Sequence, residues 1–315
     1  MNLTNLQTLI LRSKFLQSVR KFFTERDFLE IDTPALKRVG GMEPYLDPFG
    51  VLSPSMEEKG YLITSPEYSL KQALSLGVKK VYEIAHTFRS GERGSSYHTA
   101  EFLMLEFYQS NVRLEGAMDL IFELISDISY DIGKPIIQPK FNRWKVKELL
   151  TQFAQLDDWN RNSLEKKIRE LKLTGLDLNE LTYEDCFYLV FLNLVEPKLP
   201  SEFTFIYDYP PEMAALSKIE DGCAKRFELY FGNIELSNSF YELQDVEEQR
   251  KRFSEEQRLR QKLGKEVFPM NKEFLFALER GIPECTGVSI GLDRLFMVIL
   301  GLNSLEEVSP YWNQI

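Results

Sequence analysis

Apolar side chains recur at helical spacing in several parts of the chain. They fall every three or four positions across residues 5–23 and again across residues 114–132, and this period predicts amphipathic helices. Residues 246–265 are far more charged and place acidic and basic residues four positions apart, as at Glu256 and Arg260. Such i,i+4 pairs are typical of an exposed, salt-bridged helix.

Short apolar runs interrupted by turn residues predict two β-hairpins. Residues 81–88 and 100–108 flank a stretch with two glycines and three serines, which is loop composition. Further along, residues 226–231 alternate between apolar and polar positions and are followed by Gly232-Asn233 and a second apolar pattern. This arrangement predicts a hairpin with a Gly-Asn turn.

Two proline-containing segments mark the ends of shorter strands. The apolar run at residues 28–36 meets Thr33-Pro34, which predicts a strand that ends at an edge or an interface. Residues 61–64 predict a strand that leads into a helix at Ser65-Pro66-Glu67, where Ser65 can cap, the proline suits the first turn and Glu67 favours the helix dipole. A well-made helix start explains these residues; the alternative is that Glu67 points into a pocket and binds an amine.

Residues 110–200 contain mostly helical patterns, including a capping box at Thr182 and Asp185. We interpret them as a helical insertion that covers the main sheet. Near the end of the chain, a glycine-punctuated strand at 287–291 runs directly into a helix whose first residues include Asp293 and Arg294. Glycines permit a ligand to approach the backbone, and an arginine at a helix start can reach phosphate.

Composition narrows the class of protein. The chain has 315 residues, of which 43% are hydrophobic, and a net charge of −10. This charge argues against a non-specific nucleic-acid or membrane-surface binder, although a local basic patch stays open. The odd cysteine count, Cys186, Cys223 and Cys285, indicates free thiols in a reducing compartment. Because no apolar run approaches 18 residues and no signal peptide is evident, we expect a cytoplasmic protein without membrane contact.

The first hairpin carries candidate chemistry for a nucleotide. Its loop opens with Arg89 and closes with His98, and the carboxylates Glu101 and Glu106 lie on the strand that follows. An arginine can fork onto phosphate oxygens, an aromatic face can stack on a base, and carboxylates can hold a cation or an amine. A solvated hairpin with a charged tip would explain the same residues. The sequence has no Walker A loop and no G-x-G-x-x-G, so ATP would have to bind outside a P-loop or Rossmann crevice.

The second hairpin carries acidic and amide groups at positions that otherwise alternate with apolar ones. These groups are Glu228, Glu235, Asn238 and Glu242. Because unpaired buried carboxylates are costly, they need a cation, either Mg²⁺ or an ammonium group on a ligand. The alternative is a strand face that carries its charges into water. Histidine chemistry is poorly supported, since the chain has two histidines and His86 falls within a strand pattern, where we expect it to be packed in the core.

Several separated motifs resemble the class II aminoacyl-tRNA synthetases. FLEIDTP resembles their motif 1, FRSGERGSSYHTAEFLMLEFY their motif 2 and GVSIGLDRL their motif 3, in the family's order and across residues 8–305. The resemblance implies an α+β catalytic fold with an antiparallel sheet flanked by helices. It also implies ATP as a substrate, Mg²⁺ as a companion ion, and a homodimer formed through motif 1.

Within that family, TSPEY and IELSNSFYELQD resemble the lysyl type, and PECTG resembles the stand-alone lysyl-type paralogues that modify elongation factor P. The resemblance implies a single catalytic domain over residues 1–315, with the insertion at 110–200. It implies no N-terminal OB-fold domain and no anticodon-type tRNA recognition. The implied reaction is ATP-dependent activation of (R)-β-lysine or lysine as an adenylate, and its transfer to elongation factor P. Alternatives are a ligase that acts on tRNA or another amine acceptor, and a non-catalytic regulatory paralogue.

The resemblance also implies roles for matching residues. Arg89 would stabilise the charge that develops at the α-phosphate, Phe102 would stack on adenine, and Arg294 would lie on the other side of the base or reach the γ-phosphate. Mg²⁺ would bind Glu228 and Glu235. The other implied ATP contacts are Ser90, Gly91, Glu92, His98, Thr99, Glu235, Leu236 and Gly291. The implied substrate contacts are Glu67 at the backbone-side amine, Glu242 and Tyr108 at the ε-ammonium, and Ser65, Asn238 and Ser289.

Some positions depart from the family pattern. The motif 2 loop is one residue longer than the expected pattern, which affects the alignment at Gly91 and Glu92, and Thr99 replaces an asparagine. Ser289 stands where lysyl-tRNA synthetases have glycine and the paralogues have alanine. A side chain at this position is expected to reshape the amino-acid pocket and to favour a substrate other than α-lysine.

Overall fold

The computed structural model describes residues 4–55, 57–91, 95–138, 140–309 and 311. Two compact units share the chain. The first unit combines Met1–Ile136 with Glu242–Ile315, and the second unit is Ile137–Tyr241. No helix among the described residues is long and apolar enough to cross a membrane. The prediction of one domain over the whole chain stays a prediction.

The first unit is built on a sheet with the strand order β1-β5-β6-β12. Its strands are β1 (Leu29–Glu30), β5 (Lys80–Phe88), β6 (Glu101–Ser110) and β12 (Cys285–Gly291). β1 runs parallel to β5, and the other neighbours are antiparallel. Register places Ser289 opposite Glu106 and Gly287 opposite Tyr108. A smaller antiparallel sheet joins β2 (Leu36–Lys37), β4 (Lys59–Leu62) and β3 (Gly50–Leu52).

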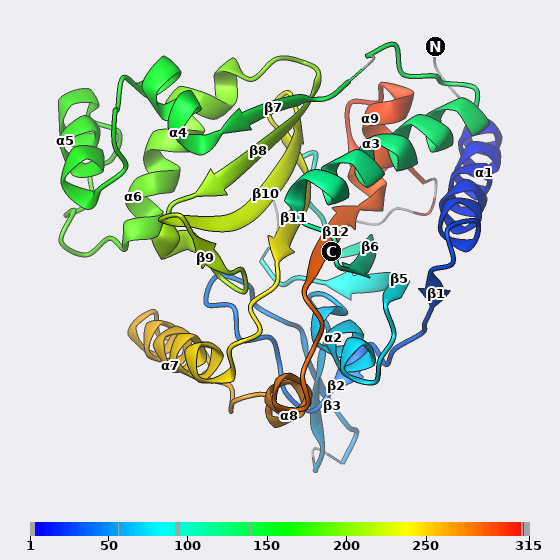
Figure 1. Ribbon diagram of the computed structural model, residues 1–315, viewed down its shortest axis with the longest axis horizontal. Helices are drawn as coiled ribbons and strands as arrows, with labels where there is room; N and C mark the ends of the chain where they lie inside the picture. Colours follow the sequence, from blue (N-terminus) through cyan, green and yellow to red (C-terminus); the bar gives the residue numbers. More distant parts are fainter. Residues whose placement is uncertain (1–3, 56, 92–94, 139, 310, 312–315) are drawn as a thin grey trace. The chain divides into compact units, whose positions relative to one another are not determined.

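Helices pack around the first unit's sheet, and Figure 1 shows α1 alongside α3. The helices are α1 (Asn5–Thr24), α2 (Glu67–Ser75), α3 (Leu114–Asp131), α7 (Val246–Lys262), α8 (Lys272–Arg280) and α9 (Leu292–Leu300). α1 begins at a capping box formed by Thr4 and Gln7, which satisfies backbone N–H groups at the helix start. Phe23 of α1 contacts the rings of Phe28, Tyr82 and Phe107, so an aromatic cluster fixes this helix to the sheet.

The second unit has its own series of paired strands and its own core. Its strands follow the order β11-β10-β8-β7, with β9 paired to β10, and are β7 (Asn142–Lys145), β8 (Phe203–Tyr209), β9 (Ile219–Glu220), β10 (Cys223–Phe231) and β11 (Ile234–Tyr241). Its α-helices are α4 (Val146–Leu149), α5 (Arg161–Leu171) and α6 (Tyr183–Val190), and short π-helical turns continue α4 and α6. Phe187, Phe191, Ile206 and Tyr209 are central members of the buried core.

The α+β class is confirmed, and so are both hairpins and the strand that runs into α9. The sheets are antiparallel apart from the parallel pairs β1–β5 and β7–β8. The capping box before α6 forms, with the Thr182 hydroxyl accepting the N–H of Asp185. β7 lies within the stretch that we predicted to be mostly helical. Its four residues alternate between part-buried and exposed, a pattern too short to identify a strand from the sequence.

Three local predictions are wrong. Ser65 does not cap α2, because the cap residue is Pro66 and makes no side-chain cap bond. The His86 side chain is 67% exposed, with Nδ1 3.0 Å from Glu101 Oε1, since the alternation of β5 turns Thr87 inward instead. Arg260 is buried and donates to the carbonyls of Glu43 and Leu46, so this turn of α7 packs against a loop of the same unit instead of lying exposed.

Candidate active site

Two predicted amine ligands meet at a buried lysine. Glu67 begins α2, and Lys71 follows one turn later on the same face. The Lys71 Nζ lies 2.6 Å from Glu67 Oε1 and 2.6 Å from Glu242 Oε2, and the residue is only 1% exposed. The structure therefore brings Glu67 and Glu242 together through a residue that the sequence interpretation missed. The i,i+4 spacing of Glu67 and Lys71 was the available signal.

β6 adds a third carboxylate to this pocket. Glu106 and Tyr108 lie two residues apart on one face of the strand, and the Tyr108 hydroxyl donates to Glu106 Oε1 at 2.6 Å. Glu106 is 2% exposed and Glu242 is 1% exposed. Among the described residues, Glu106 Oε2 and Glu242 Oε1 accept no hydrogen bond. Because an unpaired buried carboxylate oxygen is costly, the pocket is built to receive a cation or a hydrogen-bond donor.

Burial and mutual repulsion perturb these groups. Burial raises the pKa of Glu242 to about 8, with Glu67 adding to the rise and Lys71 opposing it. Burial and the nearby Glu67 also raise the pKa of Glu106 well above its usual value. Burial acts to lower the pKa of Lys71, but Glu242 and Glu67 outweigh it, so this pKa rises and the ammonium stays charged at neutral pH.

β12 closes the pocket with small residues. A Cβ atom at Gly287 would overlap Glu242 Oε1 and the Tyr108 ring, so this position requires glycine. Ser289 lies directly opposite Glu106 across the β6–β12 ladder, and cross-strand partners project from the same face. Glu67, Glu242 and Tyr108 therefore lie in one buried cluster with Lys71, and Ser289 lies on the strand beside it. Their role as substrate contacts stays a prediction. The predicted substrate contact Ser65 precedes α2 and is part-exposed.

Glu43 is a further carboxylate that the sequence interpretation missed. Its Oε2 is shielded from solvent and accepts no hydrogen bond among the described residues. Burial and Glu67 raise the pKa of Glu43, while Arg89 and Lys71 lower it, so its carboxyl group lies in the electrostatic field of the same pocket. It lies in a loop outside all three motifs, and its neighbours in sequence give no signal of this role.

The predicted phosphate ligand and the predicted adenine platform are neighbours. Arg89 follows β5, and its backbone N–H donates to the Ala100 carbonyl at 2.9 Å, which closes the hairpin base. The Arg89 guanidinium lies 5.1 Å from the centroid of the Phe102 ring, a cation–π contact. Among the other predicted ATP contacts, Thr99 is buried, whereas Ser90, Gly91 and His98 are exposed; Glu92 lies outside the described residues.

The start of α9 is fixed to the same hairpin. Asp293 Oδ2 accepts the backbone N–H of Leu103 at 2.7 Å, and Asp293 Oδ1 lies 2.6 Å from the Arg12 guanidinium. Arg294 Nε donates to the carbonyl of Tyr97 at 2.9 Å. These contacts hold Arg294 and the preceding Gly291 beside the motif 2 hairpin. The sequence interpretation did not foresee that Asp293 would anchor the helix.

In the second unit, the predicted metal ligand Glu228 is already paired with protein donors. Glu228 is 2% exposed, and its Oε1 lies 2.6 Å from Arg226 Nη2. Its Oε2 accepts the hydroxyl groups of Tyr209 and Tyr230 at 2.6 and 2.9 Å. Arg226 Nη2 also donates to Asn238 Oδ1 at 2.9 Å. Of the other predicted contacts on β11, Leu236 is buried and Glu235 is part-exposed.

This arrangement does not fit Glu228 as a ligand for Mg²⁺. Both of its oxygens already have donors, and a metal ion would have to displace them while it approached the Arg226 guanidinium. Within the described part of the chain, no group of three or more histidine, cysteine, aspartate or glutamate residues could hold a metal ion. Glu228 is better explained as the acceptor of a buried network that stabilises the second unit.

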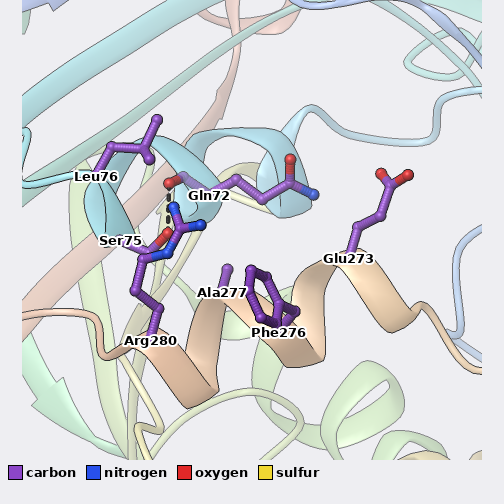
Figure 2. Close-up of a pocket in the computed structure, with 7 residues that line it drawn as sticks. All are labelled: Gln72, Ser75, Leu76, Glu273, Phe276, Ala277 and Arg280. Atoms are coloured by element: carbon purple, nitrogen blue, oxygen red, sulfur yellow. Dashed lines mark hydrogen bonds between the residues drawn. The ribbon is translucent and has the colours of Figure 1, made fainter.

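A separate groove of about 260 Å³ lies between α2 and α8. Figure 2 shows side chains of the two helices facing each other across it, namely Gln72, Ser75, Leu76, Glu273, Phe276, Ala277 and Arg280. None of these residues belongs to a motif identified in the sequence. The groove shares no residue with the buried cluster around Lys71.

Comparison with known proteins assigns the family. Residues 1–314 match the family described as "tRNA synthetases class II (D, K and N)". The chain is 35% identical to the elongation factor P--(R)-beta-lysine ligase of Buchnera aphidicola subsp. Acyrthosiphon pisum (strain Tuc7), over 98% of this chain and 95% of that protein. It is 33% and 32% identical to the proteins of the same name from Pasteurella multocida (strain Pm70) and Proteus mirabilis (strain HI4320), with the same coverage. The chain therefore belongs to the class II tRNA synthetases (D, K and N).

Proposed function

We propose that this protein uses ATP to activate (R)-β-lysine or lysine as an adenylate and transfers the acyl group to a lysine side chain of elongation factor P. The observation that carries the proposal is the buried pocket around Glu67, Glu106 and Glu242, in which carboxylate oxygens lack partners. A substrate with two ammonium groups would pair these oxygens. The family membership supports the ATP chemistry, and the names of the relatives support the acceptor.

The chemistry needs positioning more than proton transfer. The substrate carboxylate attacks the α-phosphorus of ATP, an acyl-adenylate forms and pyrophosphate leaves. The acceptor amine, in its neutral form, then attacks the acyl carbonyl, an amide bond forms as the bond to phosphate breaks, and AMP and one proton leave. A carboxylate nucleophile requires no general base, so catalysis rests on orientation and on stabilisation of charge at phosphate. Arg89 supplies that charge stabilisation, and Phe102 supports adenine from the same hairpin.

Amino-acid-dependent exchange of pyrophosphate into ATP tests the activation step. The exchange should require (R)-β-lysine or L-lysine and should be absent with L-norleucine, which lacks the side-chain ammonium and leaves a buried carboxylate unpaired. Equal exchange with L-norleucine would contradict the assignment of the pocket to a diamino acid.

Mg²⁺ belongs to the proposal as the companion of the ATP phosphates, and its protein ligands are left open because Glu228 does not fit. Glu228→Gln should lower the free energy of unfolding by about 3 kcal/mol, since it leaves the buried Arg226 without its counter-charge. The folded fraction should require the same Mg²⁺ concentration as the unsubstituted protein. Urea titration and Mg²⁺-dependent exchange measure these quantities, with the exposed Glu180→Gln as the matched control. A Mg²⁺ requirement raised tenfold without loss of stability would restore Glu228 as a metal ligand.

Substrate binding should depend on pH through Glu242. Its raised pKa of about 8 means that the free pocket holds a proton at neutral pH, while a bound ammonium favours the ionised form. Lys71 on α2, Glu67 on α2, and Glu106 with Tyr108 on β6 surround this carboxyl group. Lysine affinity should therefore rise between pH 6 and pH 8, by up to about tenfold per unit, with release of a proton on binding. Calorimetry in two buffers of different ionisation enthalpy counts the protons released. Uptake of a proton on binding would contradict the predicted pH dependence.

Ser289→Gly should shift the preference between α-lysine and (R)-β-lysine towards α-lysine. Ser289 lies opposite Glu106 in the pocket wall, so removing its side chain opens space beside the ammonium site. The ratio of kcat/KM for the two amino acids measures the effect. An unchanged ratio would show that Ser289 does not determine specificity.

We also propose that the protein acts as a cytoplasmic homodimer. Large apolar side chains are exposed on the short strands β1, β2 and β3, namely Leu29, Leu36 and Leu52. Such side chains are the kind that an interface covers. Molar mass by light scattering tests the dimer, and a monomer at micromolar concentration would contradict it.

A further inference from the structure

Lys71 occupies a position where a substrate ammonium is expected. Its Nζ lies 2.6 Å from one oxygen of Glu67 and 2.6 Å from one oxygen of Glu242, the two carboxylates proposed to bind the amines of the substrate. It takes only one oxygen from each. Glu242 Oε1, on the other side of the same carboxylate, accepts no hydrogen bond among the described residues. Lys71 thus lies against one oxygen of Glu242, and the Oε1 oxygen of that carboxylate is left for another partner.

The charges of the pocket also support a role for Lys71. When ionised, Glu67, Glu106 and Glu242 carry three negative charges, and Lys71 supplies one positive charge. Lys71 offsets one of these charges, and Glu43 adds a further carboxyl group to the same electrostatic field. Without Lys71 the buried carboxylates would lose this compensation, which burial strongly disfavours.

The surroundings of Lys71 keep its ammonium in place. The residue is only 1% exposed, and its Nζ lies 5.9 Å from the centroid of the Tyr108 ring and 5.5 Å from that of the Phe274 ring. These rings come from β6 and α8, so two further elements enclose the ammonium. A lysine held by two carboxylates between two aromatic rings has little freedom to leave. It is therefore a fixed part of the pocket wall.

We propose that Lys71 is a positioning residue for the amino acid: it orients Glu67 and Glu242 and offsets part of the negative charge of the pocket. This inference rests on the proposed function. Lys71 itself touches neither ATP nor the reacting carboxylate in this account. Its loss should therefore weaken binding of the amino acid much more than binding of ATP.

Lys71→Met tests this split, because methionine has a similar length and no charge. The KM for (R)-β-lysine or L-lysine in pyrophosphate exchange should rise by roughly 30-fold or more, as for loss of one partner of a buried charge pair, while the KM for ATP stays within about twofold. Lys79→Met is the matched control, since Lys79 is exposed and lies outside the pocket. A KM for the amino acid within twofold of the unsubstituted value, or a parallel rise in both KM values, would overturn the proposal.

Chemical rescue separates positioning from a purely structural role. Lys71→Ala removes three methylene groups and the ammonium, so propylammonium fits the space that it leaves. Added propylammonium should lower the KM for the amino acid in this variant by about tenfold or more, the scale of one recovered charge-assisted contact. Propanol, which is uncharged and of the same size, should not. Equal rescue by both compounds, or no rescue of a folded variant, would contradict the proposal.

If the neutral variants do not fold, Lys71→Arg tests the positioning role instead. Arginine keeps the charge but offers a planar fork of donors, which would occupy both oxygens of Glu242 and remove the one left for the substrate. The KM for the amino acid should therefore rise by roughly tenfold or more although the charge is preserved. A KM equal to that of the unsubstituted protein would overturn the positioning role. Failure of the proposed function is distinct, because the unsubstituted protein would then show no lysine-dependent exchange.

Discussion

Replacing Arg89 with alanine is expected to lower the rate of adenylate formation by about 10²- to 10³-fold, the usual effect of removing one group that stabilises charge in the transition state. Arg89 lies at the base of the motif 2 hairpin with its guanidinium 5.1 Å from the Phe102 ring centroid. Its position is fixed by local backbone pairing, so the loss should appear in kcat while the KM for the amino acid changes little.

Single-turnover formation of the adenylate measures this effect directly. Arg258→Ala is the matched control, because Arg258 is an exposed arginine on α7. If Arg89→Ala raised the KM for the amino acid and left the rate of the chemical step intact, Arg89 would belong to the lysine pocket and not to the phosphate site.

Glu242→Gln should have the largest effect on substrate binding. The substitution keeps the shape of the side chain but removes the charge that faces both Lys71 and the unpaired side of the pocket. Affinity for lysine should fall about 100-fold, because a buried charge-assisted contact is lost. Because burial raises the pKa of Glu242 to about 8, the neutral glutamine should leave the free energy of unfolding at neutral pH largely unchanged.

Calorimetry of lysine and of ATP binding, together with urea unfolding, separates these effects. The exposed Glu247→Gln on α7 is the control. Weakened ATP binding with unchanged lysine binding would place Glu242 outside the amine pocket and would contradict the account of Lys71 as well.

Local pattern was enough to predict most of the fold. Hairpins and amphipathic helices follow from contacts between residues close in sequence, so the α+β class, the motif 2 hairpin and the strand before α9 were all predictable. The sequence was not enough to predict which residues of a strand point into the core. The run that contains His86 has apolar residues at both odd and even positions, so the pattern does not identify the buried face. Only the packed structure shows that Thr87 points inward and His86 outward.

The sequence identified only those residues of the candidate site that lie in recognisable motifs. Glu67, Tyr108, Glu242 and Ser289 were identified by resemblance, and the structure places them on neighbouring elements, while their role in substrate binding stays a prediction. Lys71 escaped notice because a glutamate and a lysine four positions apart on a helix usually form a surface pair. Its burial depends on Glu242, which lies far away in sequence.

The hydrogen-bond partners of Glu228 could not be predicted from the sequence for a similar reason. Tyr209 comes from β8, 19 residues before Glu228, and its hydroxyl reaches the carboxylate only when β8 pairs with β10. The strand pattern alone shows that Glu228 is acidic and that its neighbours are apolar. It cannot show that donors from the same unit already satisfy both oxygens, which is what separates a metal ligand from a structural acceptor.

The intact mass of elongation factor P, after incubation with this protein, ATP, Mg²⁺ and either (R)-β-lysine or L-lysine, tests the central claim most directly. The account predicts a mass increase of one lysyl unit that requires ATP and is lost with Arg89→Ala. An unchanged mass with both amino acids, in a preparation that still exchanges pyrophosphate in the presence of lysine, would contradict it. The acceptor would then be tRNA or another amine.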